Sequence, residues 1–92
     1  MQKNKLKIFS GRSNPKLAEN IAKSLDRRLG EISIRTFSDG EIWVKYEENI
    51  RGCDVFIIQS TNGPSENIME LALLVDAAVR GSADTVTVVI PY

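Results

Sequence analysis

An unbroken apolar run from Val55 to Ile58 constrains the fold of this chain more than any other feature. A strand with one face in water alternates apolar and polar residues, whereas a continuous run is typical of a strand buried on both faces. The turn-forming residues 49–52 come just before it. The sequence therefore predicts a central strand over residues 54–59, inside a sheet that is covered on both sides.

The first helix is predicted to follow a short strand at residues 6–9. Asn14 suits the N-cap, because its side-chain oxygen can accept a hydrogen bond from the first turn, and Pro15 suits the first helical position. Apolar residues then recur at helical spacing over 17–25, which gives one apolar stripe. We expect this helix to pack on one side only and to end before Gly30.

A β-hairpin is predicted next, because residues 32–37 and 42–46 are rich in β-branched and aromatic types and alternate in polarity. The tight turn between them is Ser38-Asp39-Gly40, whose glycine can adopt a positive φ. A second helix is expected to begin near Asn67, with Glu70 completing a capping box. Since residues 68–79 are apolar nearly all round, more than one side of this helix needs cover. The residues expected to contact something beyond the domain's own sheet are Met69, Leu73 or Leu74.

A final strand at residues 85–90 completes the order strand, helix, hairpin, strand, helix, strand. This order predicts the α/β class, with a mostly parallel sheet flanked by helices and a projecting β-hairpin. Ligands of such sheets bind beyond the carboxyl ends of the strands, which nominates Ser10 to Asn14 and Gln59 to Asn62. Because the sequence stops on a buried strand at Pro91-Tyr92, we expect residues 1–92 to be one domain, cut before a second.

Composition argues against several classes of function. Twelve Lys and Arg balance twelve Asp and Glu, so no preference for nucleic acid or for a membrane surface is expected. His is absent and Cys53 is the only cysteine, so no metal ligands are expected in this chain. The N-terminus lacks the apolar run of a signal peptide. These features predict a cytoplasmic protein.

Residue chemistry leaves two interpretations open at each candidate site. Ser10 to Asn14 precedes a helix and could hold an anion, but ordinary strand-to-helix loops look the same. The carboxylates of Asp39 and Glu41 could act as an acid/base pair, yet turn-forming residues alone explain them. Arg51 is either a solvated turn residue or a residue whose guanidinium binds a phosphate through two hydrogen bonds.

Several segments in register resemble the N-terminal domain of the ribose-phosphate pyrophosphokinases, also called phosphoribosyl pyrophosphate synthetases. They are KIFSGRSNP, RTFSDGE, NIRGCDVFIIQS, NIMELALLVDAA and VTVVIPY. The resemblance implies the first of two tandem domains of phosphoribosyltransferase type. It also implies a kinase, a transferase of nucleotide biosynthesis that moves the diphosphoryl group of ATP to ribose 5-phosphate. The products are phosphoribosyl pyrophosphate and AMP, and the cofactor is Mg2+.

The resemblance also assigns roles to residues of this sequence. It implies that one hairpin group binds the adenine of ATP for a neighbouring subunit: Phe37, Asp39, Gly40 and Glu41. A second pair, Asn49 and Arg51, would hold a regulatory phosphate or ADP. No catalytic residue and no Mg2+ ligand of the family falls within this chain, so the isolated 92-residue chain is expected to be inactive. The partners implied are ATP, ribose 5-phosphate and further copies, from dimer to hexamer.

Two alternatives remain beside the enzyme domain. The first is a non-catalytic relative that binds synthetase subunits and regulates them. The second is an unrelated phosphate- or nucleotide-binding α/β module, or a designed half-domain that keeps these segments. The intact Asp39-Gly40-Glu41 turn favours the enzyme, since a non-catalytic relative would be free to lose it.

Overall fold

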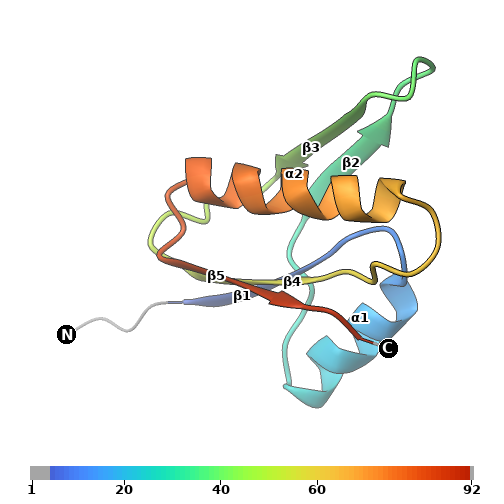
Figure 1. Ribbon diagram of the computed structural model, residues 1–92. Helices are drawn as coiled ribbons and strands as arrows, with labels where there is room; N and C mark the ends of the chain where they lie inside the picture. Colours follow the sequence, from blue (N-terminus) through green and yellow to red (C-terminus); the bar gives the residue numbers. More distant parts are fainter. Residues whose placement is uncertain (1–4, 92) are drawn as a thin grey trace.

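A parallel sheet between two helices forms the body of the molecule, and a hairpin extends from it (Figure 1). The computed structural model describes residues 5–91. The helices and strands are, in chain order, β1 (Leu6–Ser10), α1 (Pro15–Ser24), β2 (Ile32–Thr36), β3 (Ile42–Tyr46), β4 (Asp54–Ile58), α2 (Glu66–Arg80) and β5 (Thr85–Val89). The predicted α/β class, the mostly parallel sheet and the hairpin are confirmed.

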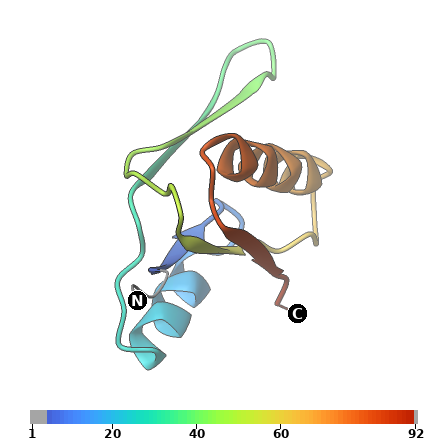
Figure 2. The ribbon, with the colours of Figure 1, turned by 90° about the vertical axis from the view of Figure 1, so that its left-hand side faces the viewer.

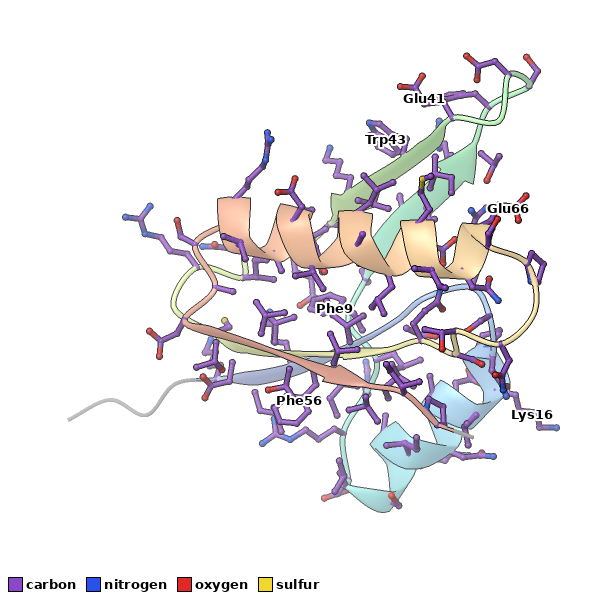
Figure 3. All side chains as sticks on the ribbon, viewed as in Figure 1. Phe9, Lys16, Glu41, Trp43, Phe56 and Glu66 are labelled. Carbon is purple, nitrogen blue, oxygen red and sulfur yellow. The ribbon has the colours of Figure 1, made fainter. Side chains whose placement is uncertain are left out.

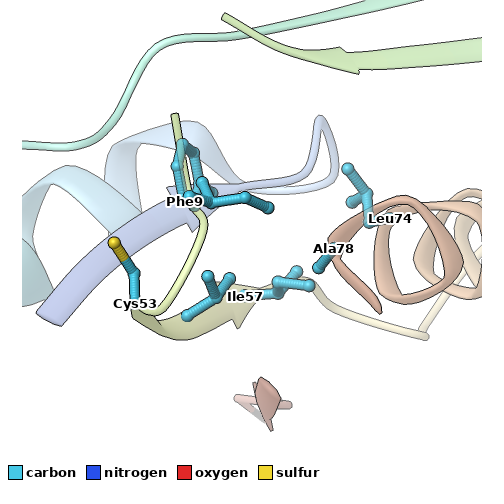
Figure 4. Packing of buried hydrophobic residues seen from close by; sticks show 7 residues of the cluster. Phe9, Cys53, Ile57, Leu74 and Ala78 are labelled. Carbon is cyan, nitrogen blue, oxygen red and sulfur yellow. The ribbon is translucent and has the colours of Figure 1, made fainter. Parts of the chain in front are cut away.

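Strand β4 is the central strand, as its apolar run predicts. It pairs in parallel with β1 on one edge and with β5 on the other. Its side chains alternate between two cores, so that Val55 and Ile57 face the α2 side while Ile58 faces the α1 side. Figure 4 shows the larger core, in which Phe9 of β1 and Leu74 of α2 pack around Ile57.

Helix α1 covers one face of the sheet through small residues. The Asn14 side chain accepts a hydrogen bond from the Leu17 amide at 3.2 Å, and Pro15 is the first helical residue, so both predictions at this end are confirmed. Ala18 and Ala22 are buried in the second core, with Ile8 and Ile58. Their small size lets the helix backbone approach the sheet closely.

Helix α2 covers the opposite face and differs from its prediction in two details. The capping box is wrong: the helix begins at Glu66, and the Glu70 carboxylate bonds to Arg12 and Gln59 instead. Leu74 is fully buried within the domain, so the expectation that it needs an outside contact is also wrong. Met69 does remain exposed. Within residues 5–91, neither helix has the length and apolar character to cross a bilayer.

The β2–β3 hairpin projects past α2 (Figure 2). Tyr46 is one of the residues that attach it at its base. The Tyr46 ring packs edge-on against Phe9, with ring centres 4.7 Å apart. Its hydroxyl donates a hydrogen bond to the Leu74 carbonyl at 2.8 Å. Burial raises the pKa of Tyr46 above its usual range, so the hydroxyl keeps its proton at physiological pH. One side chain thus joins the hairpin to β1 and to α2.

Replacing Tyr46 with Phe tests this attachment, because it removes the hydroxyl and leaves the ring contact in place. We expect a loss of about 1 kcal/mol in the free energy of unfolding, the usual contribution of one hydrogen bond. Urea denaturation of the two proteins measures it. The exposed Lys45→Gln variant on the same strand serves as a control, and equal stability of Tyr46→Phe and the parent would contradict the assignment.

Candidate functional site

The tip of the hairpin is a well-defined turn from Phe37 to Glu41. The Phe37 amide donates to the Glu41 carbonyl at 2.8 Å, and the Gly40 amide donates to the Phe37 carbonyl at 2.9 Å. Asp39 Oδ1 accepts a hydrogen bond from the Glu41 amide at 3.0 Å. Gly40 has φ +90°, a conformation that suits glycine because it has no Cβ. The structure therefore brings all four predicted hairpin residues together on one turn.

The side chains of this turn face solvent, away from both cores. Phe37 is 47% exposed. Asp39 and Glu41 are exposed as well, and Figure 3 shows Glu41 at the far end of the hairpin. The tip thus offers an aromatic face beside two carboxylates, a set that suits a flat ligand with hydrogen-bond donors.

A groove of about 560 Å3 lies between this tip and the first half of α2. Its lining residues are Asp39, Gly40, Glu41, Ile42, Ser65, Glu66, Met69 and Leu73. Sequence reasoning did not place α2 opposite the hairpin tip. One sequence feature does point to this contact: the helix is apolar nearly all round, and part of its apolar surface faces the hairpin and not the sheet.

The second predicted pair, Asn49 and Arg51, lies at the other end of β3, in the turn before β4. Asn49 Oδ1 accepts a hydrogen bond from the Arg51 amide at 3.0 Å, and Gly52 has φ +72°. Ile50 is 3% exposed and fixes the turn to the core, whereas the Arg51 side chain is exposed. The two candidate groups are therefore separated by the length of the hairpin.

Glu48, next to this turn, ties three segments together. Its carboxylate accepts hydrogen bonds from the Lys7 ammonium and from the Glu31 amide. The hydrogen bond from Lys7, followed by that from Glu31, holds the pKa of Glu48 below its usual value. The carboxylate is thus a structural contact between β1 and the loop before β2.

The loops after β1 and β4 meet at the carboxyl edge of the sheet, as their positions predict. Ser13 Oγ donates to the Gln59 side-chain oxygen at 2.7 Å and accepts from the Ser60 amide at 2.7 Å. The Arg12 guanidinium is paired with Glu70 at 2.8 Å, so its charge is already compensated. The ordinary-loop interpretation of Ser10 to Asn14 therefore fits better than an anion site.

The acidic residues do not gather into a metal site. Within residues 5–91, no group of three or more Cys, Asp or Glu side chains is placed to hold an ion. Asp39 is also engaged with the Glu41 amide. Mg2+ commonly keeps several waters and takes only one or two carboxylates together with substrate phosphates.

Comparison with known proteins identifies the family. The profile described as the N-terminal domain of ribose phosphate pyrophosphokinase matches residues 6–92. The ribose-phosphate pyrophosphokinase of Corynebacterium ammoniagenes is 57% identical over 88 residues, which cover 95% of this chain and 28% of the relative. The chain belongs to the ribose-phosphate pyrophosphokinase family. It also resembles ribose-phosphate pyrophosphokinase 2, chloroplastic, of Spinacia oleracea, at 53% identity over 96% of this chain and 22% of the relative.

A solved structure supports the same family. The phosphoribosylpyrophosphate synthetase from Mycobacterium smegmatis superposes with a TM-score of 0.91 at 42% sequence identity. The match covers 98% of this chain and 30% of the synthetase. The chain thus spans less than a third of the length of the ribose-phosphate pyrophosphokinases that it matches.

The lowered pKa of Glu48 makes part of the stability dependent on pH. The carboxylate stabilises the fold fully above the usual carboxyl pKa, and this contribution is lost as pH falls through the lowered pKa of the folded state. We expect Glu48→Gln to be about 1 kcal/mol or less below the parent at pH 7. This difference in the free energy of unfolding should disappear in acid, because Glu48 of the parent is then protonated and uncharged, like the glutamine. Denaturation at a series of pH values measures it, with the exposed Glu19→Gln as the charge control, and a gap that stays constant with pH would contradict this role.

Proposed function

We propose that the full-length protein carrying this domain is an active ribose-phosphate pyrophosphokinase. It would transfer the β,γ-diphosphoryl group of ATP to the 1-hydroxyl of ribose 5-phosphate and release AMP and phosphoribosyl pyrophosphate. The extensive identity to family members supports the reaction. The exposed Phe37 ring beside the Asp39 and Glu41 carboxylates is the observation in the structure that carries the proposal.

Within this enzyme, we propose that the hairpin supplies the adenine contacts of ATP. An exposed Phe37 ring can stack on a purine, and carboxylate or backbone oxygens at the tip can accept hydrogen bonds from its amino group. The same carboxylates repel phosphates, so the triphosphate would extend away from the tip. Because the hairpin projects from the body of the domain, it is suited to reach the reaction centre of an adjacent subunit (Figure 1).

Replacing Phe37 with Ala in the full-length protein tests the adenine contact. Stacking of a base on an aromatic ring contributes about 1–3 kcal/mol, so we expect ATP affinity to fall by roughly ten-fold or more. Glu41→Gln is expected to weaken ATP binding less. Isothermal titration with ATP and with ribose 5-phosphate measures both affinities.

The matched control is Ser33→Ala, which removes a hydroxyl that donates to Glu47 in the same hairpin, far from the tip. It should leave ATP affinity unchanged. Wild-type affinity in both Phe37→Ala and Glu41→Gln would overturn the adenine assignment. Such a result would favour a non-catalytic relative only if the unaltered full-length protein also failed to form phosphoribosyl pyrophosphate.

We further propose that the turn with Asn49 and Arg51 holds a regulatory phosphate or ADP. The exposed Arg51 guanidinium can bind a phosphate through two parallel hydrogen bonds. Asn49 shapes the turn by accepting from the Arg51 backbone amide, so substitution of Asn49 would disturb the turn, whereas substitution of Arg51 would remove the guanidinium. This site is separate from the hairpin tip, which suits regulation better than catalysis.

The outward face of α2 supports a proposal of assembly with further copies of the protein. Ile68 and Val79 lie on one face of the helix and are 56% and 62% exposed, although both are large and apolar. Apolar groups on one helix face are typical of a surface that another chain covers. A second copy is the partner that also brings a hairpin to the neighbouring reaction centre.

Replacing Ile68 with Lys tests the assembly. The side chain is exposed, so the domain should still fold, but burying a lysine in an interface is costly. We expect the full-length variant to sediment as a smaller species than the parent at the same concentration. Lys16→Glu, on exposed α1 surface, is the control. Identical sedimentation of parent and Ile68→Lys would remove this face from the interface.

A further inference from the structure

Glu70 is a carboxylate in a nearly fully buried position, at 3% exposure on the sheet side of α2. Its Oε2 accepts hydrogen bonds from the Arg12 amide at 2.7 Å and from the Gln59 side-chain amide at 3.0 Å. Its Oε1 accepts from Arg12 Nε at 2.8 Å. A buried charge is tolerated only when it is paired and hydrogen-bonded. Both carboxylate oxygens of Glu70 accept hydrogen bonds, and Arg12 supplies the opposite charge.

Arg12 continues this set of bonds toward the hairpin. While its Nε is held by Glu70, its Nη2 donates to Thr36 Oγ1 at 2.7 Å. Thr36 is the last residue of β2 and directly precedes Phe37. Because a guanidinium is planar and rigid, fixing one nitrogen also fixes the direction of the others. A Glu70–Arg12–Thr36 link therefore runs from α2, across the carboxyl edge of the sheet, to the tip end of the hairpin.

The position of the link along the hairpin determines what it can do. In the β2–β3 register, Tyr46 pairs with Ile32 at the base, whereas Thr36 pairs with Ile42 next to the tip turn. Tyr46 attaches the base to α2 and β1. Ile34 and Val44, which pair in the middle of the hairpin, also pack against the core, so the tip end beyond them is the part whose direction the Thr36 bond can fix.

We propose that Arg12 and Glu70 are positioning residues that fix the direction of the hairpin and so place its tip for the nucleotide. This inference deepens the proposed function and rests on it for the nucleotide. It also explains why Arg12, at the edge where ligands of such sheets bind, is neutralised by Glu70: the arginine serves the hairpin and not a phosphate.

Thr36→Val tests the link with the least disturbance, because it replaces the hydroxyl by a methyl group of similar size on an exposed strand residue. Direct change of Glu70 could unfold the protein by leaving Arg12 and Gln59 without a partner. We expect Thr36→Val in the full-length protein to raise the ATP KM about three- to ten-fold, because the free energy of one lost hydrogen bond corresponds to a change in affinity of that order. The kcat should change less than two-fold. Thr36→Ser, which keeps the hydroxyl, should restore the KM.

A distance measurement tests the orientation without any nucleotide. Spin labels at Ser38 on the tip and Arg80 on α2, both exposed and outside the proposed interface, are placed in a background without other reactive cysteines. We expect Thr36→Val to broaden the distance distribution between them and Thr36→Ser to keep it narrow. Ser33→Ala, on the same hairpin, is the matched control and should leave the distribution unchanged.

The two measurements separate this inference from the proposed function. An unchanged distribution in Thr36→Val, or broadening that Thr36→Ser does not reverse, would overturn the positioning role whatever the ATP affinity. If Phe37→Ala leaves ATP binding intact while Thr36→Val broadens the distribution, the adenine assignment fails and the link stands. A loss of thermal stability in Thr36→Val with no change in KM or distribution would reduce the link to a stabilising contact and refute the proposal.

Discussion

Burial of β4 on both faces and pairing on both edges is the constraint on which the rest of the structure depends. Its apolar side chains each contribute about 1.5–3 kcal/mol by leaving water, which requires a helix on either face. Because β1 and β5 occupy the two edges, the hairpin between α1 and β4 cannot join this sheet next to β4. It pairs with itself and projects, so the arrangement of the candidate site follows from the core.

The sequence predicts those parts of the fold that depend on local pattern. Asn14 and Pro15 fix the start of α1 because capping acts within one turn. The apolar run of β4 does not alternate with polar residues, which indicates that the strand is buried on both faces. Gly40 marks the hairpin because a positive φ is a property of one residue. Each of these signals comes from residues close together in the chain, so no knowledge of distant partners is needed.

The features that the sequence misses all depend on distant partners. Glu70 has the spacing of a capping box, but its bonds are to Arg12, 58 positions away. Leu74 lies on a helix that is apolar nearly all round, so periodicity alone cannot tell which side faces the sheet. At the candidate site, the sequence predicts the four residues of the tip turn, yet the groove against α2 and the link through Thr36 depend on tertiary packing. The resemblance to the family supplies ligand roles that neither pattern nor packing contains.

Where the Arg12–Thr36 bond does not hold the tip end, a small tilt of the hairpin near Tyr46 is amplified toward the tip. A strand of five residues extends about 17 Å at the usual rise. A tilt of about 10° at its base would therefore move the far end by about 3 Å, the length of a hydrogen bond. Once that bond is lost, substitutions in the core around Phe9 or Leu74 can displace the tip while the turn itself stays intact, so their effect depends on how far they tilt the hairpin and not on how close they lie to its tip.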